Sequence, residues 1–128
     1  MATWEDVSAV ALAFPEVEEG TNGEGHLVWG VRGKSIGWER PLRKGDLAAL
    51  GAAAPAGPIL CARVPDVGAK EALVADGGDV YFTTPHFANY PAVLVRLENI
   101  GVDELHELLE EAWLAQAPKR LAAAYLAG

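Results

Sequence analysis

The sequence predicts an α+β fold: a five-stranded antiparallel sheet with helices on one face, in the order α-β-β-β-α-β-β-α-α. Segments whose apolar residues alternate are joined by short turns, and segments with helical spacing stand in groups around them. Of the 128 residues, 51% are hydrophobic, which suits one globular domain over residues 1–128.

The first predicted element is a helix whose amino terminus is marked by Thr3. Thr3 and Asp6 have the spacing of a capping box, and the helical pattern ends at Phe14, before Pro15. Residues 16–25 are acidic and glycine-rich, so we expect a surface loop there.

A period of two begins at His26 and predicts strands over 27–31 and 34–40, joined by a tight turn at Arg32-Gly33. Regular alternation would give each strand one apolar face. These faces hold Leu27, Trp29 and Val31 in the first strand, and Ile36 and Trp38 in the second.

The middle of the chain begins with residues 41–58, rich in Gly, Ala and Pro, which predict a long mobile connection with at most a short helix from Lys44 to Leu50. Residues 59–64 are mostly apolar and predict a central strand. A helix is expected from Asp66 to about Ala75.

The last third begins with strands predicted over 80–83 and 92–97, on either side of the loop 84–91. Asp103 then starts the clearest helix, and Pro118 fits the first turn of a final helix through Tyr125. The inward face of the clearest helix is expected to hold Leu105, Leu108, Leu109, Ala112 and Gln116.

The charge is unevenly distributed along an acidic chain of net charge −8. Residues 5–24 and 98–111 each carry six acids and no base, whereas residues 32–46 carry five bases against two acids. We call these five bases the basic wing: Arg32, Lys34, Arg40, Arg43 and Lys44. Lys119 and Arg120 are candidates to join it in space.

The loop 84–91 contains His86 and Tyr90 between two prolines. His86 is a candidate base or ligand, because imidazole titrates near neutral pH. No Ser, Cys or Asp stands close in sequence as a catalytic partner. The interpretation we favour is an anchor that pins the loop against the last helix, with contact to a ligand or protein partner through His86 and Tyr90 as the alternative.

Other chemistry finds little support in the sequence. The single cysteine, Cys61, excludes an internal disulfide and is expected to be a buried, inert thiol. There is no HExxH or P-loop pattern, so we predict no catalytic residue, no metal site and no cofactor. Without a signal peptide pattern or a long apolar run, we expect a cytoplasmic monomer that does not contact membranes.

Several stretches together resemble the MmcQ/YjbR family of small bacterial domains. They are ALAFPEVEEGT (11–21), VRGK (31–34), YFTTPHF (81–87), YPAVLVRL (90–97), AW (112–113), APKRL (117–121) and Tyr125. The resemblance implies helices packed on one face of a curved antiparallel sheet, as in frataxin-like and secretion-chaperone-like domains. It also implies DNA binding.

Two functions follow as expectations, neither of them enzymatic. The first is weak, salt-sensitive DNA binding by the basic wing with Lys119 and Arg120. The alternative is a protein-interaction or small-ligand-binding module that uses the loop 84–91 or the sheet face, without nucleic acid.

Overall fold

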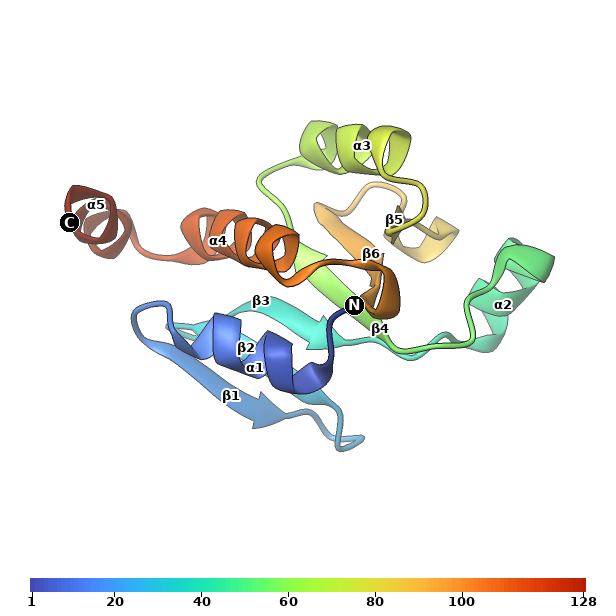
Figure 1. Cartoon of the computed structure of the whole chain (residues 1–128), viewed down its shortest axis with the longest axis horizontal. Helices are drawn as coiled ribbons and strands as arrows, with labels where there is room; N and C mark the ends of the chain where they lie inside the picture. Colours follow the sequence, from blue (N-terminus) through green and yellow to red (C-terminus); the bar gives the residue numbers. More distant parts are fainter.

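The computed structural model describes residues 1–128 and has a six-stranded antiparallel sheet in the order β1-β2-β3-β4-β6-β5 (Figure 1). The strands are β1 (Val17–Thr21), β2 (Leu27–Val31), β3 (Lys34–Glu39), β4 (Ile59–Arg63), β5 (Tyr81–Phe82) and β6 (Ala92–Arg96). The helices are α1 (Trp4–Leu12), α2 (Lys44–Leu50), α3 (Val67–Asp76), α4 (Val102–Gln116) and α5 (Lys119–Ala127). Three short 3-10 helices complete the fold: η1 (Gly51–Ala53), η2 (Pro85–Phe87) and η3 (Leu97–Asn99). The predicted α+β class is confirmed.

The predicted strand number is too low by one, because the expected loop over 16–25 contains β1. This strand pairs only with β2, from Val17↔Val31 to Thr21↔Leu27. In β1, Val17 is half-buried and the other four residues are exposed. The strand therefore shows none of the apolar alternation that marks a strand buried on one face. Backbone pairing at the edge of the sheet forms this strand.

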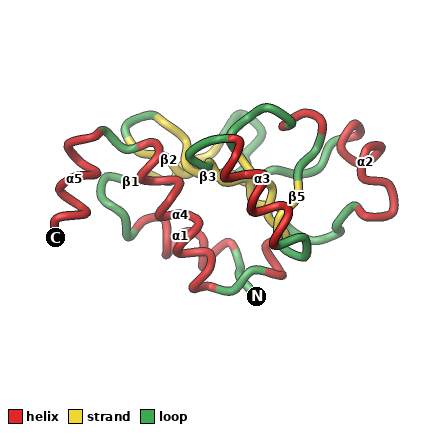
Figure 2. The backbone as a smooth tube through the Cα atoms, turned by 90° about the horizontal axis from the view of Figure 1, so that it is seen from above, coloured by secondary structure: helices red, strands yellow, loops and turns green.

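The main core lies between the sheet and the helices α1 and α4. Figure 2 shows these two helices side by side along the molecule. Trp29 of β2 and Trp113 of α4 are its largest fully buried side chains. On α4 the predicted inward residues Leu105, Leu108, Leu109 and Ala112 are all buried, and Gln116 at its end is half-buried. The helical periodicity therefore identified the correct face.

The opposite face of the sheet is covered in part, which corrects the expectation of helices on one face only. A smaller cluster there contains Cys61, Leu94 and Phe87, and Leu50 packs against it. Phe87 belongs to η2 and Leu50 to α2. The segment 41–58 thus supplies the expected short helix, and this helix covers part of the second face.

A β-bulge in β3 separates two residues that regular alternation places together. Trp29 pairs with Gly37 and Gly30 with Ser35, so Ile36 has no partner in β2. Ile36 consequently joins the main core, whereas Trp38 turns to the opposite face and packs against the smaller cluster. The predicted common face of Ile36 and Trp38 is therefore wrong.

No helix is both long enough and apolar enough to cross a bilayer.

Candidate binding site

Arg40, which directly follows β3, is a structural anchor. Its guanidinium Nη2 lies 3.0 Å from Oδ2 of Asp46, and their side chains are only 8% and 5% exposed. Arg40 also donates to the carbonyl of Pro41 and lies over the Phe87 ring, 5.3 Å from its centroid. It therefore joins the end of β3 to α2 and η2.

Asp46 is the matching acid at the start of α2. Its carboxylate accepts the backbone N–H of Arg43 at 2.9 Å, which caps the helix. Burial raises the pKa of Asp46, but the Arg43 N–H and the charge of Arg40 outweigh burial and leave the pKa below its ordinary value. Asp46 is thus held ionised opposite Arg40.

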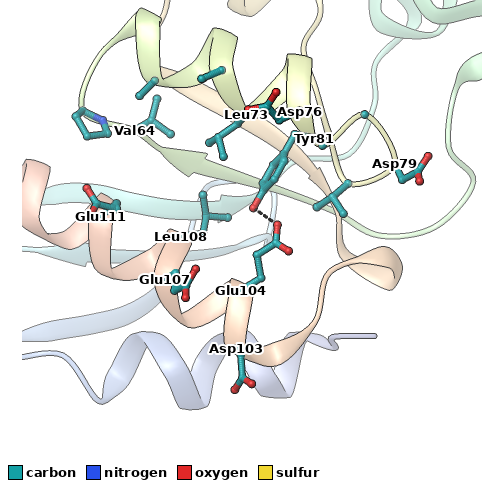
Figure 3. A pocket seen from close by; sticks show the side chains of 16 residues that line it. Val64, Leu73, Asp76, Asp79, Tyr81, Asp103, Glu104, Glu107, Leu108 and Glu111 are labelled. Atoms are coloured by element: carbon teal, nitrogen blue, oxygen red, sulfur yellow. Dashed lines mark hydrogen bonds between the residues drawn. The ribbon is translucent and has the colours of Figure 1, made fainter.

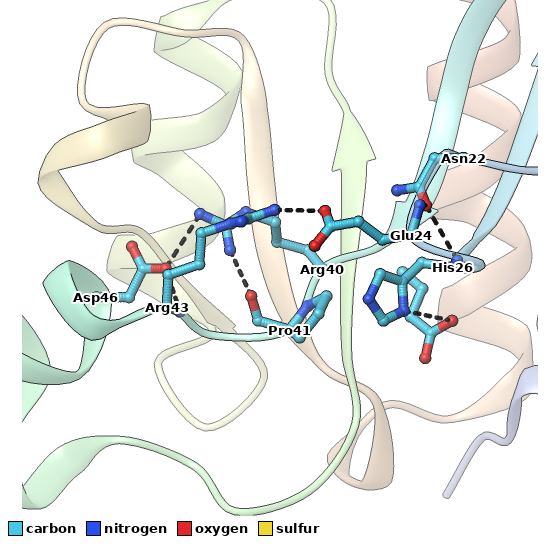
Figure 4. Close-up of polar contacts among 8 residues, drawn as sticks. Asn22, Glu24, His26, Arg40, Pro41, Arg43 and Asp46 are labelled. Atoms are coloured by element: carbon cyan, nitrogen blue, oxygen red, sulfur yellow. Dashed lines mark hydrogen bonds and ion pairs between the residues drawn. The ribbon is translucent and has the colours of Figure 1, made fainter.

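The side chain of Arg43 is much more exposed to solvent than that of Arg40. Its Nη2 lies 3.0 Å from Oε1 of Glu24, with side chains 60% and 57% exposed (Figure 4). An ion pair this exposed contributes about 0–1 kcal/mol, so another carboxylate can replace Glu24 at little cost.

The loop 84–91 is anchored, as predicted, but by a residue that the sequence did not single out. Lys70 of α3 is only 2% exposed. Its Nζ donates to the carbonyls of Phe87 and Tyr90, the latter at 3.1 Å. Burial lowers the pKa of Lys70. The expected contact with the last helix is wrong, because α5 lies at the other end of the molecule (Figure 1).

His86 and Tyr90 both face solvent on this anchored loop. Tyr90 is 41% exposed. The guanidinium of Arg63 lies 5.2 Å from the centroid of its ring. The His86 ring meets the Phe87 ring edge-on, with 4.9 Å between their centroids. The loop therefore presents two side chains that are free to contact a ligand.

These residues surround one hollow of about 620 Å³ on the second face of the sheet. We call it the aromatic hollow. It is lined by Asn22, His26, Trp38, Glu39, Arg40, Pro41, Arg43, His86, Phe87 and Tyr90. Two of the basic wing residues and both loop candidates thus meet at one place, which the sequence order alone did not indicate.

The wall formed by residues 22–26 is held by local hydrogen bonds. Oδ1 of Asn22 accepts the N–H groups of Glu24 and His26, at 2.9 and 3.0 Å. Glu39 accepts the N–H of Leu27 at 3.1 Å and lies 3.6 Å from Nδ1 of His26. These contacts fix the position of residues 22–27 beside the hollow.

None of the remaining predicted cations lines the hollow. Arg32 pairs with Glu16 at the β2–β3 turn, at 2.5 Å. Lys34, Lys44, Lys119 and Arg120 are exposed and form no ion pair. Three of the five basic wing residues therefore have carboxylate partners.

The basic wing is also divided between two ends of the molecule. Lys34 begins β3 near the end of α4, where Nε2 of Gln116 donates to the carbonyl of Ser35 at 3.1 Å. Arg43 and Lys44 begin α2 at the opposite end (Figures 1 and 2). The strand between them spans roughly 20 Å at about 3.3 Å per residue. Lys34 instead lies toward the end that carries α5, with Lys119 and Arg120.

Sequence reasoning missed Trp38, Asn22 and His26 as lining residues. The one available signal was Gly37, because an isolated glycine in a strand often marks a bulge. No group of three or more His, Cys, Asp and Glu side chains is arranged to hold a metal ion.

Comparison with known proteins matches residues 12–115 to the model of the YjbR family. The chain belongs to the YjbR family. The resemblance inferred from the motifs is thereby confirmed. Over 130 aligned residues, this YjbR domain is 52% identical to uncharacterized proteins of Mycobacterium tuberculosis (strain H37Rv) and Mycobacterium bovis, covering 99% of this chain and 98% of each relative. No solved structure matches the chain.

Proposed function

We propose that this YjbR domain is a non-enzymatic binding module that takes a ligand or a partner segment into the aromatic hollow. The proposal is supported above all by the convergence of Trp38, Tyr90 and Arg43 on one cavity from segments far apart in the sequence. A volume of about 620 Å³ lies in the range of small-molecule sites, roughly 300–1,000 Å³.

The lining indicates the chemistry of the ligand. Trp38 and Tyr90 offer aromatic surface against which a planar or apolar group can pack, whereas Phe87 is buried. Arg43 and His86 offer donors, and the Arg43–Glu24 pair is exposed enough to be exchanged. The complementary ligand carries a carboxylate beside an aromatic or apolar body, either as a small molecule or as a side-chain pair of a protein.

Titration followed by NMR tests this function. Indole-3-acetate, benzoate and a peptide containing adjacent Asp and Phe serve as probes, and we expect shifts at the Trp38 indole N–H and the amides of residues 86–90. Tyr90→Ala and Arg43→Gln should each weaken binding about tenfold, the equivalent of ~1.4 kcal/mol. Lys34→Gln, which removes a charge at the other end of β3, is the matched control. Binding that both variants retain, or no shift with any probe at millimolar concentration, would contradict the proposal.

DNA binding is the second candidate, and it is supported by exposed cations without carboxylate partners at the start of β3 and the start of α5. Lys34, Lys119 and Arg120 are exposed and have no carboxylate partner there. Three such cations can neutralise about three phosphates, which gives weak binding. The logarithm of the binding constant should then fall with the logarithm of the salt concentration, with a slope of roughly −0.9 for each phosphate contact. The buried Arg40 is not available for this contact.

Gel retardation of duplex DNA at about 25 mM salt tests the second candidate, because low salt favours phosphate contacts. We expect retardation at micromolar protein, lost in Lys119→Glu/Arg120→Glu and kept in Arg43→Glu. The absence of retardation in the unmodified protein would exclude it.

A further inference from the structure

The largest hollow of the molecule is a groove of about 1040 Å³ between α3 and α4, separate from the aromatic hollow. Its floor is apolar: Val64 and Leu108 are buried there, while Leu73 and Val80 are half-buried. The half-buried Leu73 and Val80 are the floor side chains that remain partly open to a partner.

Carboxylates form both rims of this groove. Glu107 and Glu111 line the groove from α4, and Asp103 stands at the first turn of α4 and points away from α3 (Figure 3). Across the groove, Asp76 ends α3 and Asp79 lies in the turn that follows. No Lys, Arg or His lines the groove, and none of these acids belongs to an ion pair. The rims therefore present uncompensated negative charge on both sides of an apolar floor.

Two features of this arrangement are unfavourable in the free protein. Asp103, Glu107 and Glu111 are spaced one helical turn apart, where like charges repel. Asp76 is the last residue of α3, at the negative end of the helix dipole. A cationic partner would reduce both the repulsion along α4 and the unfavourable interaction of Asp76 with the helix dipole.

One wall of the groove is fixed in place before any partner arrives. Oη of Tyr81 in β5 donates to Oε2 of Glu104 in α4, at 2.7 Å. This contact ties the start of α4 to the edge of the sheet. Glu104 is thus engaged, and the five other carboxylates remain free for a partner.

We propose that the α3–α4 groove docks a basic amphipathic helix of another protein. Such a helix carries Lys or Arg one turn apart, about 6 Å, which matches the spacing of Asp103, Glu107 and Glu111 along α4. Its apolar side chains fill the floor over Leu73 and Leu108. A second copy of this chain is a poor occupant, because each copy has a net charge of −8.

A synthetic peptide serves as the probe: a helix of about 15 residues with Lys at i, i+4 and i+8 and Leu on the same face between them. We expect micromolar binding by calorimetry, weaker at high salt. The substitutions Glu107→Gln/Glu111→Gln should reduce the affinity about tenfold. Glu5→Gln/Glu18→Gln removes the same charge from exposed positions elsewhere and should have no such effect.

A second variant tests the apolar floor without changing charge. Ala72 is exposed and lines the groove, so Ala72→Trp should fill it and abolish peptide binding while the fold is kept. Tyr90→Ala, in the aromatic hollow, should bind the peptide normally.

Several outcomes would overturn this proposal. The first is that a peptide of the same composition with scattered lysines binds as tightly as the designed peptide. The second is that both groove variants bind the designed peptide as tightly as the unmodified protein does. The third is that equimolar spermidine displaces the peptide, and the last is that the protein forms a dimer in sedimentation that depends on the groove residues. The last would identify a second copy as the occupant.

Discussion

Glu16 and Arg32 are the two non-glycine residues with positive φ, at 58° and 51°, and their side chains pair with each other. They flank the first ladder pair of β1 and β2, Val17↔Val31. The hydrogen bond from Arg32 is the main cause that lowers the pKa of Glu16. Two unfavourable backbone conformations therefore meet across one corner of the sheet, joined by an exposed ion pair.

This corner predicts an unusual order of stabilities at position 32. Arg32→Gly should unfold at higher urea than Arg32→Ala, with a difference in the free energy of unfolding of about 1 kcal/mol, because only glycine adopts this φ without strain. Both variants lose the ion pair with Glu16, so the comparison isolates the backbone. Equal midpoints by tryptophan fluorescence would show that the corner is not strained.

The buried Arg40–Asp46 pair predicts a large effect of its removal. Asp46→Asn should lower the free energy of unfolding at pH 7 by about 3 kcal/mol, because it leaves a buried guanidinium without a counter-charge. Asp103→Asn, at an exposed position, is the control and should change stability little. Urea unfolding measures both.

The same pair predicts how stability depends on pH. The pKa of Asp46 is lower in the folded protein than in the unfolded chain, where it is about 3.9. The stabilisation by ionised Asp46 is therefore complete at pH values above the pKa of the unfolded chain. It is lost as the pH falls through the pKa of the folded protein. Asp46→Asn should lack this part of the acid destabilisation. The free energy of unfolding should therefore be measured against pH for the unmodified protein and for Asp46→Asn. Parallel curves between about pH 5 and 2 would show that Asp46 does not contribute to the acid destabilisation.

Cys61 should be unreactive in the folded protein. Its thiol is fully buried in β4, and burial raises its pKa to about 12. An aromatic disulfide reagent at neutral pH should therefore label it only at the rate of unfolding, and urea should make labelling fast. Rapid labelling in native buffer would show that this face of the sheet opens.

Tyr125 should hold α5 to the rest of the domain. This helix has no buried residue, but Oη of Tyr125 donates to Glu110 at 2.5 Å and its ring lies 4.9 Å from that of Trp113. Tyr125→Ala should increase amide exchange over residues 119–127 and leave the sheet protected. Tyr125→Phe keeps the ring contact and should have a smaller effect. Unchanged exchange in both would show another anchor.

Helical periodicity was the most reliable guide to this fold. Leu105, Leu108, Leu109 and Ala112 were assigned to the core from spacing alone, because a long amphipathic helix repeats its signal over four turns. The strand β1 was missed, since it buries almost nothing. The strand β1 is defined by its backbone pairing with β2, and a single sequence does not show which segments pair.

The aromatic hollow was only half predictable. His86 and Tyr90 were noticed as unusual residues between prolines, and Arg40 and Arg43 as cations, yet nothing linked the two groups. The link depends on a β-bulge that turns Trp38 outward and on Lys70, which reaches the loop from α3. Both are tertiary effects, and a count of charges along the chain likewise did not indicate that Arg40 and Asp46 form a buried pair.

The two margins of the sheet have a consequence for the handling of this protein. An outer strand with free backbone groups invites a neighbouring molecule to extend the sheet, the first step of fibre growth. Here one margin, β1, carries Glu18 and Glu19, and the other, β5, is only two residues long. Concentrated solutions should therefore stay clear, because neither margin of the sheet offers a long uncharged strand for a neighbouring molecule to extend.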